Sequence, residues 1–98
     1  MVKAILITEQ ENDIKEIDLQ IDKIHELLRG PATFIGQYPE IDVVIMKCRE
    51  SIFELKLNQN ILPAPFDTEA VLGSILLIRM DINSEPRDFT LFEYYNIK

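Results

Sequence analysis

The chain has 98 residues, 47% of them hydrophobic, and a formal net charge of −7. This length corresponds to about one domain, and the hydrophobic content is enough to bury a core without disulfides. A charge of this sign repels phosphate backbones and anionic membrane surfaces, so we expect no direct contact with nucleic acid or membrane. The acidity either keeps a small domain soluble or imitates a nucleic acid toward a basic protein.

The cysteine content and the first residues bear on the compartment. Cys48 is the only cysteine, which favours a reducing environment. The apolar run at residues 1–7 is shorter than a signal peptide or a membrane span requires. We therefore expect one cytosolic domain over residues 1–98.

Short aliphatic or alternating runs predict most of a sheet. Such runs lie at residues 2–8, 14–19, 32–37, 41–48, 51–57 and 74–81. The first and last of them contain uninterrupted apolar stretches, at residues 4–7 and 75–78, as is typical of strands buried on both faces. Residues 2–8 and 14–19 would form a hairpin, and the apolar residues 43–46 favour a central position.

Helical periodicity replaces the strand pattern after residue 17. The apolar residues at helical spacing are Ile17, Ile21, Ile24, Leu27 and Leu28, which predicts the main helix over residues 21–29. Asp18 or Asp22 can cap its first amides. Gly30 and then Pro31 provide a stop signal.

The last third combines a proline-containing loop with a capped helix. Two prolines make residues 58–67 a stiff loop, and residues 67–72 could form one helical turn capped by Asp67. Thr90 and Glu93 have capping-box spacing, which predicts a short terminal helix over Leu91–Tyr95. The predicted fold is therefore α+β: a mainly antiparallel, mixed sheet of five or six strands with one main helix and a short C-terminal helix.

No arrangement of residues satisfies a known catalytic or metal-binding chemistry. His25 and Cys48 are single residues of their kinds, and nothing in the sequence activates the thiol or supplies further metal ligands. Glu85, Asp88 and Glu93 are close in sequence, but loop acids in a domain of this size are more often solvated than paired across a cleft. Phosphate-binding glycine motifs are absent. We expect no catalytic residues, no metal and no cofactor.

One candidate binding surface remains, for a small polar ligand, a nucleotide or a partner protein. Side-chain amides, arginines and tyrosines supply hydrogen bonds, phosphate pairing and stacking. The candidate residues are Asn58, Asn60, Pro63, Pro65, Phe66, Arg79, Arg87, Tyr94 and Tyr95. An ordinary structural use is open for each of them: the asparagines can make turns, Phe66 can fill the core and Arg79 can pair with an acid.

Several segments resemble a small family of unknown function that is encoded by bacteriophages and large DNA viruses of algae. The similarity lies in LNQNILPAPF (residues 57–66), GSILLI (73–78) and DFTLFEY (88–94), with further likeness at residues 3–7 and 26–30. The double proline and residues 88–94 look closest to the algal-virus branch. The resemblance implies a virus-encoded accessory protein in the cytoplasm of the host cell, and it brings no activity with it.

These observations lead to two expectations about function. The first is a non-enzymatic accessory protein that binds a host or viral protein stoichiometrically, by analogy with other small viral proteins that lack catalytic residues. The alternative is a homo-oligomer that sequesters a nucleotide signal at a subunit interface. In that case the nucleotide would be bound by Asn60, Arg79, Arg87 and Tyr94. Because a domain this small has little room for a deep pocket, that alternative requires self-association.

Overall fold

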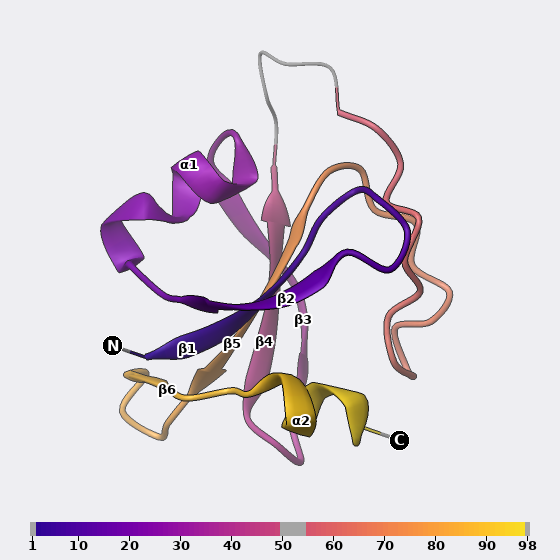
Figure 1. Ribbon diagram of the computed structural model, residues 1–98. Coiled ribbons are helices and arrows are strands. Elements are labelled where there is room, and N and C mark those ends of the chain that lie inside the picture. Colours follow the sequence, from indigo (N-terminus) through magenta and orange to yellow (C-terminus); the bar gives the residue numbers. More distant parts are fainter. Residues whose placement is uncertain (1, 50–54, 98) are drawn as a thin grey trace.

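The computed structural model describes residues 2–49 and 55–97 (Figure 1). The strands and helices follow one another along the chain in an order close to the predicted one. They are β1 (Lys3–Ile7), β2 (Ile14–Asp18), the 3-10 helix η1 (Ile21–Lys23), α1 (Ile24–Leu28), β3 (Ala32–Tyr38), β4 (Val43–Cys48), β5 (Ile75–Met80), β6 (Pro86–Arg87) and α2 (Leu91–Tyr95). The predicted α+β class is confirmed.

The strands form a six-stranded sheet in the order β2-β1-β5-β4-β3, with β6 paired to the end of β5. Every pairing between these strands is antiparallel, so the sheet is not mixed. The predicted hairpin is β1 with β2, in the register Ile5↔Glu16. Strand β4 lies between β3 and β5, as its apolar sequence indicated.

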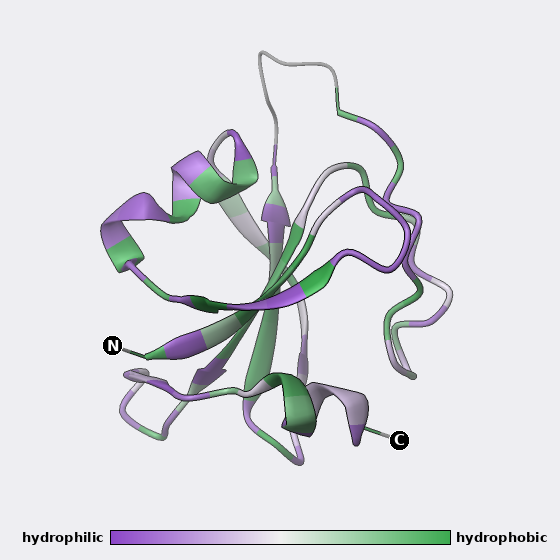
Figure 2. Cartoon of the chain, in the orientation of Figure 1, coloured by the Kyte–Doolittle hydropathy of each residue, from purple (hydrophilic) through white to green (hydrophobic). Residues whose placement is uncertain are grey.

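The sheet is buried on both faces, because successive side chains of a strand point to opposite sides. In β1, Ile5 and Ile7 belong to one core cluster and Ala4 and Leu6 to the other. Strand β5 divides in the same way, with Ile75 and Leu77 on one side and Leu76 and Ile78 on the other. Figure 2 shows this hydrophobic content along the central strands. The continuous apolar runs of the sequence are explained by this two-sided burial.

Different segments cover the two faces. Leu28 of α1 is buried in the cluster that contains Leu6 and Leu76, so η1 and α1 cover that side. The opposite cluster takes in Leu62 and Val71 from the long loop, and Phe89 and Tyr94 from the C-terminal segment. The loop and α2 are therefore structural layers of the domain.

The main helix is less regular than its sequence predicts. Its first turn is the 3-10 helix η1, and neither Asp18 nor Asp22 occupies the cap position, where Gln20 makes no side-chain hydrogen bond. The left-handed residue at its end is Arg29 (φ 63°). Since Pro31 favours an extended conformation for the residue before it, the left-handed turn falls one residue earlier than Gly30.

The predicted helical turn at residues 67–72 is absent. The amide of Asn58 donates to the carbonyl of Val71 at 2.8 Å, and the amide of Gly73 donates to the carbonyl of Lys56 at 2.8 Å. Leu57 and Leu72 form an isolated antiparallel bridge. Backbone groups that are paired across the loop cannot also form helical hydrogen bonds, which explains why the predicted helical turn does not form. The first part of the predicted strand at 51–57 lies outside the described residues.

Helix α2 begins as predicted, with both hydrogen bonds of a capping box. The Thr90 hydroxyl accepts from the Glu93 amide at 3.2 Å, and the Glu93 carboxylate accepts from the Thr90 amide at 3.3 Å. The Leu91 amide also donates to the carboxylate of Glu16 at 3.0 Å. These contacts fix the start of α2 against the sheet.

Candidate functional site

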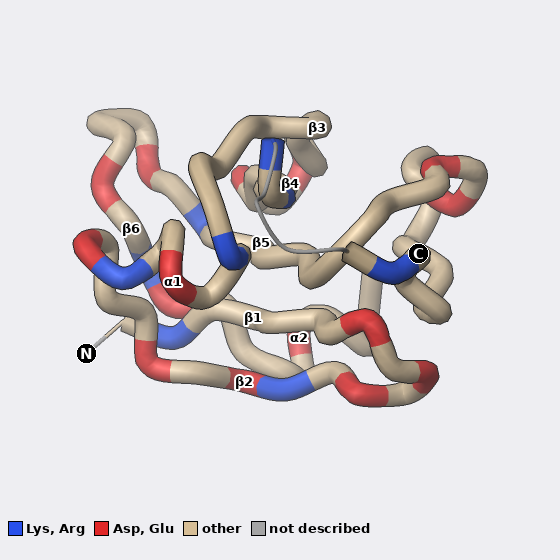
Figure 3. The backbone as a smooth tube through the Cα atoms, turned by 90° about the horizontal axis from the view of Figure 1, so that it is seen from above, with Lys and Arg blue, Asp and Glu red and all other residues tan. Residues whose placement is uncertain are grey.

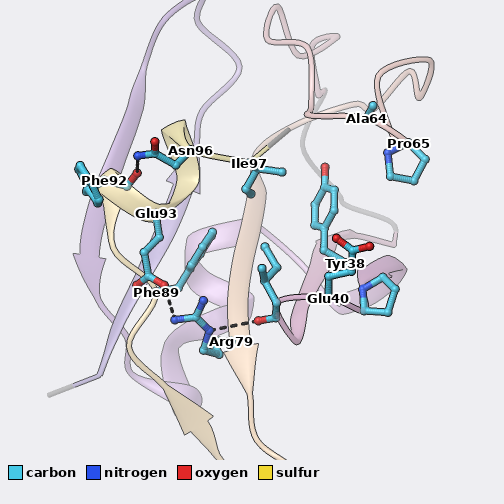
Figure 4. Close-up of a pocket in the computed structure, with 12 residues that line it drawn as sticks. Tyr38, Glu40, Ala64, Pro65, Arg79, Phe89, Phe92, Glu93, Asn96 and Ile97 are labelled. Atoms are coloured by element: carbon cyan, nitrogen blue, oxygen red, sulfur yellow. Dashed lines mark hydrogen bonds and ion pairs between the residues drawn. The ribbon is translucent and has the colours of Figure 1, made fainter.

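A pocket of about 690 Å³ lies between α2, the β3–β4 turn and the proline loop. Figure 4 shows Glu93 and Asn96 on one side, Tyr38 and Pro65 on the other, and Arg79 between them. The lining residues are Tyr38, Pro39, Glu40, Ile41, Ala64, Pro65, Arg79, Phe89, Phe92, Glu93, Asn96 and Ile97. Apolar groups predominate among them, and the volume is in the usual range for ligand sites.

Arg79 is held in place by three elements. Its Nη1 lies 2.6 Å from the carboxylate of Glu93 and donates to the Asp88 carbonyl at 2.9 Å, while its Nε donates to the Ile41 carbonyl at 3.1 Å. Its guanidinium carbon is 5.3 Å from the centre of the Phe89 ring, a cation–π distance. This guanidinium therefore links β5 to α2 and to the turn between β3 and β4.

The Arg79 contact also sets the charge state of Glu93. Burial raises the pKa of the Glu93 carboxyl, but the hydrogen bond and charge of Arg79, together with the donors of Thr90, outweigh burial. The pKa consequently lies below its ordinary value of 4.5. At neutral pH the pocket lining carries Glu40, Glu93 and Arg79, a formal sum of −2 + 1 = −1.

Aromatic residues form the opposite wall. The rings of Tyr38 and Phe66 meet edge to face, with 4.9 Å between centroids and 87° between planes. The Tyr38 hydroxyl donates to the Pro63 carbonyl, and burial raises its pKa well above the ordinary value. Phe66 also packs over Gly36, where an added Cβ would lie 2.4 Å from its ring. Ring contacts therefore hold this wall together, with the acidic Glu40 beside it.

The predicted asparagines lie away from this pocket and have structural roles. Asn58 Nδ2 donates to the carbonyls of Ile7 (3.3 Å) and Gly73 (2.9 Å), and its Oδ1 accepts from the Asn60 amide at 2.9 Å. Asn60 Nδ2 donates to the carbonyls of Thr8 and Gln10, in the β1–β2 turn. Together they fasten the loop to the hairpin.

The remaining predicted residues are dispersed. Pro65 and Arg79 line the pocket, and Pro63 and Phe66 support its wall. Arg87 pairs with Asp81 at 2.8 Å in the turn between β5 and β6. Tyr94 is buried in the core, and Tyr95 is exposed beside it. The nine residues therefore do not form one surface.

Several lining residues were not singled out in the sequence. Tyr38 is the last residue of β3, and Glu40 and Ile41 lie in the turn after it. Phe92 is in α2, and Asn96 directly follows α2. Phe92 shares a short helix with the partly buried Leu91 and the buried Tyr94, and the structure leaves it 77% exposed. An exposed aromatic residue on a docked helix is a reasonable marker of a binding site.

The residues considered for chemistry also have defined positions. His25 is exposed on α1, and Cys48 is buried in β4. Asp88 accepts a hydrogen bond from the Lys3 amide at 2.9 Å, and Glu85 lies 3.9 Å from Arg87. Within residues 2–49 and 55–97, no group of three or more His, Cys, Asp or Glu could hold a metal ion. No helix in the same part of the chain is long and apolar enough to cross a membrane.

Comparison with known proteins identifies a family. The sequence model of a family of unknown function (DUF5880) matches residues 5–97, so the chain belongs to that family. No curated protein and no solved structure matches the chain.

Proposed function

Because membership of this family brings no activity with it, we propose a function from the site: a non-enzymatic accessory protein that binds a protein partner stoichiometrically at the pocket beside α2. The observation that carries the proposal is an apolar cavity of about 690 Å³ whose interior arginine is already bound by protein groups. Such a site favours an apolar side chain of a partner.

Charge indicates the chemistry of that partner. The pocket lining has a formal charge of −1, with Glu40 exposed at its rim, and the whole chain carries −7. A partner segment with an apolar side chain next to lysine or arginine would be complementary to the apolar pocket and to the negative charge around it. Long-range attraction between the acidic chain and such a segment would also speed their association. We therefore propose a basic partner, consistent with the idea that the acidity imitates a nucleic acid.

The nucleotide-sequestering alternative has weaker support. It would use Arg79 and Arg87 to pair with phosphate, but Arg79 is bound by Glu93 and two carbonyls, and Arg87 pairs with Asp81 elsewhere. A phosphate entering the pocket would have to displace Glu93 or lie close to it. The alternative stays open as an outcome of the binding test.

The viral origin and the location in the host cytoplasm are part of the same proposal. They are supported by the resemblance of residues 57–66 and 88–94 to proteins of phages and algal viruses. In the structure these two segments supply Ala64, Pro65 and α2, which line the pocket. The segments that carry the resemblance therefore also build the candidate site.

Calorimetric titration with three probes tests the proposal. The first is an end-capped peptide with one phenylalanine flanked by lysines (the lysine peptide), the second has glutamates in their place, and the third is a set of mono-, di- and cyclic nucleotides. We expect binding of the lysine peptide, much weaker binding of the glutamate peptide, and loss of affinity at high salt. Nucleotide binding without peptide binding would replace the proposal by the sequestering alternative.

Variants of the pocket locate the binding. Ala64→Trp places a large side chain in the pocket, and Phe92→Ala removes the exposed aromatic residue of the pocket. Each substitution should raise the dissociation constant of the lysine peptide about tenfold or more. Phe34→Ala is the matched control, because Phe34 is also exposed but lies on β3 outside the pocket. Equal effects of Phe34→Ala and Phe92→Ala would contradict a specific site.

A further inference from the structure

The acidic charge of the chain is spread over its surface. Figure 3 shows acidic residues on several turns of the chain. The turn between β1 and β2 holds Glu9, Glu11 and Asp13, and the turn between β5 and β6 holds Asp81 and Glu85. A basic segment that is attracted by the net charge of −7 could meet any of these turns. A preference for basic partners at the pocket therefore needs an acidic group at the pocket itself.

Two glutamates line the pocket, and the charge of one of them is already compensated. Glu93 lies 2.6 Å from Nη1 of Arg79 through its Oε2. Its Oε1 accepts from the amide of Thr90 at 3.3 Å and from the hydroxyl of Thr90 at 3.2 Å. Both carboxylate oxygens of Glu93 are thus engaged within the chain. A basic residue of a partner would have to compete with Arg79 before it could pair there.

The second glutamate, Glu40, is available for a partner. Within residues 2–49 and 55–97, no lysine or arginine forms an ion pair with its carboxylate. Glu40 is exposed at the rim, between Pro39 and Ile41 of the pocket lining. An exposed carboxylate keeps much of its hydration when it pairs with a lysine, so recognition at this position requires little desolvation.

The turn that carries Glu40 has a fixed place relative to α2. The amide of Ile41 donates to the carbonyl of Tyr38 at 3.2 Å, which closes the turn around Glu40. The carbonyl of Ile41 accepts from Nε of Arg79 at 3.1 Å, and Arg79 pairs with Glu93 of α2. In Figure 4, Glu40 lies on the Tyr38 side of Arg79, and Glu93 lies on the other side. The two acidic groups therefore face a bound segment from different walls.

We propose that Glu40 selects the basic partner of this pocket, by pairing with a lysine or arginine next to the apolar side chain that enters it. The proposal rests on the proposed function, because it names the group that recognises the charge of the same partner. It places the basic residue of the partner beside the β3–β4 turn and not beside α2, where Arg79 compensates Glu93. Since exposed ion pairs are weak, Glu40 supplies selectivity and the apolar pocket supplies most of the affinity.

Charge reversal at Glu40, measured with three peptides, tests the proposal. The lysine and glutamate peptides are compared with a third, in which glutamines replace the lysines (the glutamine peptide). Glu40→Gln should raise the dissociation constant of the lysine peptide about two- to fivefold. Glu40→Lys should make the glutamate peptide the tighter ligand of the two. Both variants should bind the glutamine peptide within about twofold of the wild-type affinity, which also shows that they are folded.

Glu11→Lys is the matched control for the net charge of the chain. It makes the same charge change in the exposed β1–β2 turn, at the end of the sheet away from α2 and the β3–β4 turn (Figure 1). Long-range attraction depends on the net charge, which is the same in Glu11→Lys and Glu40→Lys. We therefore expect Glu11→Lys to keep the preference for the lysine peptide.

Failure of the proposal and failure of the proposed function give different results. If none of the three peptides binds the wild-type chain, the proposed function is wrong, and so is the role of Glu40. If the glutamine peptide binds normally to Glu40→Lys but the lysine peptide stays the tighter ligand, the pocket is intact and the proposal alone is overturned. Equal changes of preference in Glu40→Lys and Glu11→Lys would overturn it in the same way.

Discussion

Asn58 shows how a single polar side chain organises the long loop. It is only 9% exposed, and its amide group joins the carbonyls of β1 and of Gly73 to the backbone of Asn60. Asn58→Ala would leave these buried groups without partners, so we expect unfolding in urea to show a loss of about 2–3 kcal/mol. Gln59→Ala, at an exposed neighbour, should change the unfolding free energy by less than about 0.5 kcal/mol. Similar losses for both would contradict this role.

Glu93 gives the stability a defined pH dependence. Its pKa is depressed in the folded protein, so its contribution is present above its ordinary value of 4.5 and is lost as the pH falls through the lower folded pKa. Glu93→Gln should therefore flatten the loss of stability below about pH 4.5, measured by urea unfolding across pH. In an Arg79→Met background the same substitution should have a smaller effect. An equal effect in both backgrounds would exclude the Arg79 contact as the cause.

The sequence could identify only part of the site at the level of single residues. Pro65 and Arg79 were recognised because proline and arginine have strong individual preferences. Tyr38 and Asn96 could not be recognised, since they come from segments that meet only after the sheet has formed. For Asn58 and Asn60 the sequence left a ligand role and a structural role open, because a side-chain amide suits both, and the structure shows hydrogen bonds of the structural kind.

At the level of elements, α2 depends on its capping box. Thr90→Ala removes the hydroxyl that accepts from the Glu93 amide and should cost about 1 kcal/mol of unfolding free energy. Because α2 supplies one wall of the pocket, the lysine peptide should also bind more weakly. Thr90→Ser keeps the acceptor and serves as the control for both measurements. If the Thr90→Ala variant were destabilised but bound the lysine peptide with full affinity, α2 would not contribute to the binding site.

Elements with local signals were predictable, and those set by distant contacts were not. The residues of α2, from Leu91 to Tyr95, follow from the capping box, and the apolar runs of β1 and β5 follow from two-sided burial. Residues 67–72 contain a good local helix signal, yet pairing with residues 56–58 takes their backbone groups. Tertiary contacts overrode local propensity in that segment.

At the scale of the whole molecule, the charge of the chain and the lining of the pocket have the same sign. The pocket beside α2 is lined mainly by apolar groups, and the acidic Glu40 is exposed at its rim. We propose that this pocket receives a basic partner, because the charge of the rim and of the whole chain is complementary to one. The acidic chain would attract a basic partner over the screening distance of about 8 Å at physiological salt.

The most direct test of the central claim is an amide chemical-shift map of the chain titrated with the lysine peptide. We expect shifts confined to the pocket, at residues 38–41, at Ala64 and at residues 89–97, and we expect them to disappear in Ala64→Trp. Shifts centred on β2 or on the turn at residues 81–85, or a spectrum unchanged by the peptide, would contradict it.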